Sequence, residues 1–375
     1  MHLVDTTMFF ASEGGGVGRY LAAKHDWLAQ HSAIRHTIVA PGAHDTIDRR
    51  GLITVSSPAL PGLQGYRFPM HVTRWSQCLV DLQPDVIEAG DPYVPAWAAL
   101  RAGDRLGVPV VGFYHSDLVR LIGARAGRWI EPVVARYVRN LYRRFDLVIA
   151  PSRYVYHKLA ALGLSRIACR PLGVDINLFH PSRRDPQLRR ELNLSEDTRL
   201  AIFAGRFARE KNLLVLLDAF KRLGPRYHLL LVGSGMDLPA QSNATVYPYQ
   251  RSGEALARLM ASSDLLVHAG DQETFGLIVL EAMACGRPVI AANSGGLAEL
   301  IAPGTGILAA PRDSGAIAQA VSAAYACDIE QMGRRARTHV EGTFSWDIVM
   351  RSLIACYSQL TAAQAVSEPE SYAIR

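Results

Sequence analysis

The chain has 375 residues, of which 49% are hydrophobic and 20% are charged, and its formal net charge is +6 at pH 7. This length exceeds what one hydrophobic core usually organises, so we expect two domains. The composition excludes a disordered or fibrous chain, and no apolar run reaches the roughly 18 residues that a membrane span needs. The 5 cysteines are scattered, with no Cys-x-x-Cys pair, and no signal peptide is visible, so a reducing cytoplasm is expected.

In chain order, the first half alternates short apolar runs with helical patterns, which indicates a parallel sheet with crossover helices. A strand at 3–10 is followed by the glycine loop EGGGVG and a helix at 19–31. Another helix is expected at 95–106, and the pattern PSRYVYHKLAALG predicts a helix that ends at Gly163. Further strands are predicted at residues 36–40, 52–55, 85–88, 108–114 and 146–150, the last of which should close the sheet.

The second half repeats this design, with helices at 212–223 and 254–262. Its strands are predicted at residues 200–204, 228–232, 244–247, 265–268 and 289–292. A connector rich in Pro, Gly and charged residues at 171–186 marks the boundary. We therefore expect an α/β fold with two doubly wound parallel-sheet domains, 1–170 and 171–345, followed by an amphipathic helix.

The segment DLLVHAGDQETFGLIVLEAMACGRP at 264–288 predicts a buried strand, a polar loop and a helix. Glu273 precedes the helix, and Glu281 lies about two turns further on. A helix N-terminus exposes unpaired N–H groups that suit a phosphate, and the two carboxylates could bind sugar and ribose hydroxyls. The alternative is that both acids only cap and solvate a structural helix.

Cations and glycines at other strand ends add to this pattern. Arg206 and Lys211 follow an apolar strand and could hold a diphosphate, unless they are two solvated charges. Gly14, Gly15 and Gly16 let a backbone approach a ligand closely, although they also suit a flexible turn. His115 ends a buried strand, where parallel sheets place ligands, but a lone histidine there is otherwise a core residue.

Several motifs are excluded. The glycine loop fails the Gly-x-Gly-x-x-Gly spacing, and no P-loop Gly-Lys-Ser/Thr is present. No Asp-x-Asp or His-x-x-x-His is available for a metal, and no Gly-x-Ser-x-Gly elbow occurs. We therefore expect neither a metal ion nor another cofactor.

Charge is uneven along the chain. Residues 1–170 hold 20 Lys and Arg against 13 Asp and Glu, so this half could face a membrane surface or nucleic acid. The predicted helix near 131–144 carries arginines on one side and Val133, Val134, Tyr137, Val138 and Leu141 on the other. Such a basic amphipathic helix suits an anionic membrane, although an ordinary surface helix rich in Arg is the alternative. The residues expected to face the membrane are Arg128, Trp129, Arg136, Arg139 and Arg143.

Taken together, these motifs resemble glycosyltransferase family 4. The resemblance is carried by ETFGLIVLEAMACGRPVI with its Glu-x7-Glu spacing and supported by GRFAREKN, LVGSG, PLGVD, SGGLAELI and EGGGVGRY. It implies a GT-B fold, in which two Rossmann-like domains face each other across a cleft. The second domain would bind a nucleotide sugar and the first an acceptor, with the helix at 346–362 returning to the first domain.

Carried over residue by residue, the resemblance implies that Glu273 binds donor-sugar hydroxyls and Glu281 binds the ribose. Arg206 and Lys211 would hold the diphosphate, and His115 would lie beside the reacting carbon. The catalytic residues are thus His115, Arg206, Lys211 and Glu273. The nucleotide-sugar site would comprise Gly15, Gly16, Gly205, Gly233, Tyr249, Gln250, Arg251, Thr274, Phe275, Gly276, Leu277 and Glu281.

The family retains anomeric configuration without a metal, so the implied reaction moves a hexosyl unit from GDP-mannose or a UDP-sugar to an acceptor hydroxyl. The departing phosphate would help to deprotonate that hydroxyl. The segment HSDLVRL is similar to members that build glycolipids, which implies a lipid or lipid-linked acceptor, no nucleic acid, and a place at the inner face of the cytoplasmic membrane. Two alternatives stay open, a sugar-nucleotide epimerase and a non-catalytic sugar-nucleotide binder.

Overall fold

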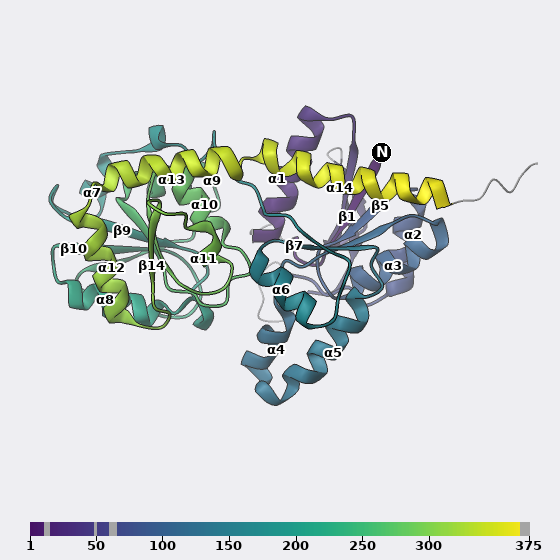
Figure 1. Ribbon diagram of the computed structural model, residues 1–375, viewed down its shortest axis with the longest axis horizontal. Helices are drawn as coiled ribbons and strands as arrows, with labels where there is room; N and C mark the ends of the chain where they lie inside the picture. Colours follow the sequence, from purple (N-terminus) through teal and green to yellow (C-terminus); the bar gives the residue numbers. More distant parts are fainter. Residues whose placement is uncertain (11–15, 49–50, 60–65, 368–375) are drawn as a thin grey trace, which may run out of the picture. The chain divides into compact units, whose positions relative to one another are not determined.

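The computed structural model describes residues 1–10, 16–48, 51–59 and 66–367. These residues form two compact units, each an α/β unit built on a largely parallel sheet (Figure 1). The first unit comprises Met1–Pro171 and the residues from Met350 on, and the second is Leu172–Val349. The expected α/β fold of two doubly wound sheets is therefore confirmed for each unit.

The sheet of the first unit has the strand order β3-β4-β2-β1-β5-β6-β7-β8 among the described residues. All neighbouring strands are parallel except β3 and β4. The strands are β1 (His2–Thr6), β2 (Arg35–Gly42), β3 (Thr46–Ile47), β4 (Leu52–Ser56), β5 (Val86–Ala89), β6 (Val110–Phe113), β7 (Leu147–Ala150) and β8 (Ile167–Cys169).

Two predictions for this sheet were wrong. The first strand ends at Thr6 rather than at residue 10, and the strand at 146–150 does not close the sheet. β8 pairs in parallel with β7 and forms the edge. β8 has the apolar sequence IAC but is only 3 residues long, so the run is shorter than the pattern that marks the predicted strands.

The helices of the first unit include two that the sequence pattern defines well at their ends. α3 has a proline in its first turn, and Gly107 ends it in the left-handed conformation at φ 68°. α6 begins at the N-cap Ser152, whose side chain accepts a hydrogen bond from the amide of Val155. The helices are α1 (Gly16–His31), α2 (Val72–Asp81), α3 (Val94–Leu106), α4 (Leu118–Ala126), η1 (Arg128–Ile130), α5 (Glu131–Tyr142), α6 (Arg153–Ala161) and α14 (Trp346–Ser367).

The two faces of this sheet differ because side chains alternate along each strand. Val4 and Ile87 lie in an apolar core together with residues of α2 and α3. Their neighbours Asp5 and Glu88 point to the opposite face, where they meet Lys24 of α1 and Tyr357 of α14.

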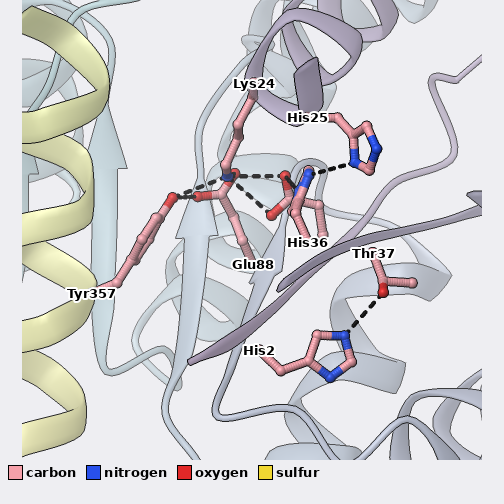
Figure 2. A network of polar contacts seen from close by, with 8 residues as sticks. His2, Lys24, His25, His36, Thr37, Glu88 and Tyr357 are labelled. Atoms are coloured by element: carbon pink, nitrogen blue, oxygen red, sulfur yellow. Dashed lines mark hydrogen bonds and ion pairs between the residues drawn. The ribbon is translucent and has the colours of Figure 1, made fainter. Parts of the chain in front are cut away.

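Figure 2 shows this polar network, whose side chains are almost wholly buried. The Lys24 ammonium donates to Asp5 and Glu88 at 3.0 Å each, and the Tyr357 hydroxyl donates to Glu88. Desolvation alone would lower the pKa of Lys24, but the two carboxylates raise it, so the amine is charged. A buried charge is stable only when its partners are in place, so the network fixes α14 on this face.

The second unit has a fully parallel sheet of order β11-β10-β9-β12-β13-β14 among the described residues. Its strands are β9 (Arg199–Ala204), β10 (Tyr227–Gly233), β11 (Ala244–Pro248), β12 (Leu265–His268), β13 (Val289–Ala292) and β14 (Gly306–Ala309). Its helices are η2 (Pro181–Arg183), α7 (Gln187–Glu191), η3 (Arg209–Lys211), α8 (Leu213–Leu223), α9 (Gly253–Ser262), α10 (Leu277–Ala284), α11 (Leu297–Leu300), α12 (Ser314–Ala326) and α13 (Ile329–Thr343).

Strand order reverses once in each sheet. The chain runs outward from β1 to one edge and then continues from β5 on the other side, and in the second unit the reversal lies between β9 and β12. Ligands of open parallel sheets bind outside the carboxyl ends of the strands at such points. Ligand-binding residues are therefore expected directly after β1, β5, β9 and β12.

Candidate functional site

The carboxyl ends of β9 and β12 bring together two residues that the sequence singled out. Lys211 ends η3, the short helix that follows β9, and Glu273 lies in the loop after β12. The Lys211 ammonium donates a hydrogen bond to Oε1 of Glu273. Desolvation would raise the pKa of Glu273, but Lys211 and His268 hold it well below its usual value. Glu273 is therefore an ionised, oriented acceptor for hydroxyl groups.

His268 is a third member of this group, and sequence reasoning missed it. It ends β12, is almost fully buried, and its Nε2 lies 3.4 Å from Oε1 of Glu273. The amide of Gly270 donates to its Nδ1 at 3.1 Å, so Nδ1 is an acceptor and the ring proton is on Nε2. His268 thus donates to Glu273 and helps to orient its carboxylate.

Further contacts hold the loop that carries Glu273. The side-chain amide of Asn212 donates to the carbonyl of Ala269 at 3.0 Å and to Asp271 at 3.2 Å. Asp271 also accepts from Arg312 at 2.6 Å. The amide of Gly296 donates to the carbonyl of Glu273 at 2.8 Å. A Cβ on Gly296 would lie 2.5 Å from the carbonyl oxygen of Thr274, so this close approach requires glycine.

The helix after this loop is α10, which begins at Leu277. Its N-cap is Gly276 with φ 107°, a left-handed conformation that other residues rarely adopt. The amide of Val279 already bonds to the carbonyl of Gly276. The amides of Gly276 and Leu277 precede it at the helix start, where a helix has no internal partner for them, so they are placed to offer N–H groups. Glu281 is buried in the second turn of α10. The ring of Phe275 points into the core, where it packs edge-to-face on Phe344 at 6.2 Å.

Arg206 differs from Lys211 in its surroundings. Its side chain is 64% exposed and donates to Glu210 at 3.0 Å. Gly205 and Gly233 end neighbouring strands, because Gly205 follows β9 and Gly233 is the last residue of β10. Tyr249, Gln250 and Arg251 follow β11 of the same sheet, and the side-chain amide of Gln250 donates to the carbonyl of Pro248.

In the first unit, His115 follows β6 at the corresponding sheet edge. Its ring stacks on Phe113 at 4.0 Å between centroids and packs on Tyr20 at 5.2 Å. Desolvation, and then the nearby Lys24 charge, lower the pKa of His115 to about 3, so the imidazole is neutral at physiological pH. Gly16 is the first residue of α1, whereas Gly14 and Gly15 lie outside the described residues.

The predicted membrane-facing residues lie on η1 and on α5 or just after it, and all five are exposed. Trp129 is 75% exposed. Val134, Val138 and Leu141 are buried as the helical spacing predicts, but Val133 and Tyr137 are exposed, at 61% and 37%. They were predicted on the apolar side. Trp129, Val133 and Tyr137 follow one another at intervals of about one helical turn, so they share a surface with Arg136.

No group of three or more His, Cys, Asp or Glu residues is arranged to hold a metal ion in the described part of the chain. No helix there combines the length and apolar character that crossing a bilayer requires.

Comparison with known families decides the identity. The family profile for glycosyltransferase family 4 matches residues 14–178, and the profile for glycosyl transferases group 1 matches residues 184–339. The chain belongs to glycosyltransferase family 4. All described strands except β1, which precedes residue 14, thus lie within matched segments of a glycosyltransferase.

Among its relatives, this glycosyltransferase is 35% identical to a GDP-mannose-dependent alpha-mannosyltransferase of Mycobacterium tuberculosis, over 63% of the chain and 62% of the relative. A counterpart in Mycolicibacterium smegmatis is 37% identical over 60% of each protein. The chain thus spans less than two thirds of these relatives. Over the full length of both chains, it is 28% identical to a GDP-mannose-dependent alpha-(1-6)-phosphatidylinositol dimannoside mannosyltransferase of M. tuberculosis.

Solved structures share the GT-B fold. A sucrose-phosphate synthase from Thermosynechococcus elongatus superimposes with a TM-score of 0.81 at 21% identity, over 97% of this chain and 100% of that one. HepE from Anabaena, in complex with UDP and glucose, gives a TM-score of 0.76 at 20% identity over 96% and 99% of the chains.

Proposed function

We propose that this glycosyltransferase moves a hexosyl unit, with retention of configuration, from a nucleotide-diphosphate sugar to an acceptor hydroxyl. The observation that carries the proposal is the Lys211–Glu273 pair at the reversal point of the second sheet. It offers a cation for a diphosphate and a carboxylate for sugar hydroxyls within one site. The names of two relatives support GDP-mannose as the donor to test first.

The chemistry proposed for the site is charge stabilisation. As the bond to the sugar breaks, negative charge develops on the leaving diphosphate, where Arg206, Lys211 and the first amides of α10 would meet it. The acceptor hydroxyl attacks from the same face, and its proton passes to the leaving phosphate. Since two cations and a helix N-terminus supply the positive charge, the reaction requires no metal ion.

A coupled assay for released nucleoside diphosphate tests the proposal, with GDP-, UDP- and ADP-sugars and a polyol acceptor. Lys211→Ala should lower kcat on the order of a hundredfold, because its interaction grows in the transition state. The matched control is Lys221→Ala on the exposed side of α8, which should keep wild-type turnover. An epimerase or a binding protein would release no diphosphate, and full activity of Lys211→Ala would refute the assigned role.

The metal-free mechanism has its own test. Activity should be unchanged after treatment with EDTA and removal of the chelator–metal complex. Complete loss of turnover that Mg²⁺ restores would contradict it.

The acceptor is proposed to be a lipid or lipid-linked glycan at an anionic membrane surface. The support is the exposed surface formed by Trp129, Val133 and the arginines of α5, together with the dimannoside lipid in the name of one relative. Each basic residue near such a surface contributes about 1 kcal/mol. Replacing Arg136, Arg139 and Arg143 by Ala should therefore weaken binding to phosphatidylserine vesicles about a hundredfold at low salt. Equal binding to neutral and anionic vesicles would contradict the proposal.

A further inference from the structure

Asp91 lies at the reversal point of the first sheet, a position that the sequence analysis did not single out. It follows Gly90 after β5, beside Thr7 at the end of β1. A Cβ on Gly90 would lie 3.5 Å from both Thr7 and the ring of His115. Thr7, Asp91 and His115 therefore border one point at the carboxyl edge of the sheet, where parallel sheets bind ligands.

The two oxygens of the Asp91 carboxyl group differ in their contacts. Oδ2 accepts from the hydroxyl of Thr7 and from the amide of Met8, each at 2.7 Å. These two bonds fix the orientation of the group. The backbone amide of Tyr93 lies close enough to the carboxyl group to lower its pKa, but it forms no hydrogen bond with Oδ1. Oδ1 is buried and accepts no hydrogen bond from the rest of the described chain, so it is held in place for an atom that the protein itself does not provide.

The absence of a nearby cation sets Asp91 apart from other buried carboxylates. Asp5 and Glu88 pair with Lys24, and Asp117 pairs with Lys158. Asp91 is 2% exposed, yet no described Lys, Arg or His forms an ion pair with it. Desolvation therefore raises its pKa to about 6, although Thr7 and the amides of Met8 and Tyr93 act in the opposite direction. Burying a carboxylate without a cation or a full set of hydrogen bonds is unfavourable in free energy. A ligand that bonds to the group would offset this cost.

The surroundings indicate the chemistry of that ligand. A neutral hydroxyl satisfies a carboxylate oxygen with a short, charge-assisted hydrogen bond, and His115 adds a neutral imidazole nearby. Phe9 and Tyr93 pack edge-to-face at 5.7 Å and supply an aromatic wall next to the same strand ends. Carboxylate, imidazole and aromatic groups together suit a polyol.

We propose that Oδ1 of Asp91 accepts a hydrogen bond from a hydroxyl group of the acceptor substrate, which makes Asp91 an acceptor-binding residue. The inference rests on the proposed glycosyl transfer. The groups assigned to the donor's diphosphate and hydroxyls, Lys211 and Glu273, belong to the second unit, whereas Asp91 belongs to the first. A donor hydroxyl has the same chemistry, so the experiment separates the two sources.

The test compares transfer to the acceptor with hydrolysis of the donor by water in wild type and Asp91→Asn. A lost hydrogen bond to a charged group predicts about a 10- to 100-fold lower kcat/KM for the acceptor in the variant. Donor hydrolysis and the donor's Kd should be unchanged. The melting temperature at pH 7.5 should stay equal or rise, because the variant buries no charge. The matched control is Asp104→Asn, an exposed aspartate of α3.

Each other outcome overturns the inference in a recognisable way. An equal loss of transfer and hydrolysis assigns Asp91 to the donor, and unchanged transfer shows that Oδ1 binds no substrate. A lower melting temperature with proportionate loss of both activities shows a structural role only. Failure of the proposed function itself is distinct, since wild type would then release no nucleoside diphosphate from any sugar nucleotide.

Discussion

His268 offers a sharp test of the donor site, because its two ring nitrogens have different partners. Nε2 donates to Glu273 over 3.4 Å, and Nδ1 accepts from the amide of Gly270 at 3.1 Å. Hydrogen bonds to charged groups contribute about 1.5–3 kcal/mol, and the long Nε2–Oε1 distance places this one at the lower end. His268→Leu should therefore lower kcat/KM about tenfold through poorer orientation of Glu273.

The same variant also leaves the buried amide of Gly270 without its acceptor, which should cost about 1–3 kcal/mol of stability. Two conservative variants separate the effects. In His268→Gln the side-chain amide reaches the Nε2 position and should restore activity but not the melting temperature. In His268→Asn the side-chain oxygen lies near Nδ1 and should restore the melting temperature but not activity.

Steady-state kinetics with saturating acceptor, together with thermal unfolding, measure both effects. His228→Leu is the matched control, since His228 is buried in β10 of the same sheet and bonds to Thr245. It should lose stability without a comparable loss of kcat/KM. The reasoning fails if His268→Asn is fully active, or if His268→Gln is no more active than His268→Leu.

Three further predictions concern the buried network and the Glu273 loop. Desolvation raises the pKa of Glu88 to about 7, so its contribution to stability is complete below its ordinary pKa of 4.5 and is lost as pH rises through 7. The free energy of unfolding of Glu88→Gln, measured in urea, should therefore rise relative to that of wild type between pH 5 and pH 8, by ~3 kcal/mol at most. A difference that does not change with pH would contradict this. Tyr357→Phe removes the hydroxyl that bonds to Glu88 and should lower the melting temperature by an amount equivalent to about 1–3 kcal/mol. Gly296→Ala should displace the loop and lower kcat/KM about tenfold or more, whereas Gly342→Ala in α13, with open space around it, should not.

Much of the fold could be predicted because buried parallel strands are continuous apolar runs. The predicted strands at 265–268 and 289–292 coincide with β12 and β13. β8 could not be found this way, since its apolar run is only 3 residues long. α2 has the sequence VTRWSQCLVD and was not predicted, although Trp75 and Leu79 are buried at helical spacing.

The candidate site shows a similar division. Lys211 and Glu273 could be proposed because each follows an apolar strand next to a glycine, and the structure places them in contact. His268 and Asp91 could not be proposed, since a histidine within a buried strand and an aspartate before a proline both have common structural roles. Only the strand order brings Asp91 to the reversal point of its sheet, and one sequence does not contain that order.

The helix α14 has a consequence for biosynthesis. During translation, residues 1–171 leave the ribosome first and the whole second unit follows, before the part of α14 that completes the first unit is made. Until then Glu88 has no Tyr357 hydroxyl, and the face of the sheet that holds Lys24 lacks its covering helix. The first unit is therefore expected to stay incompletely folded while the second unit is synthesised. A fragment of residues 1–171 should accordingly bind chaperones more strongly than the full chain does.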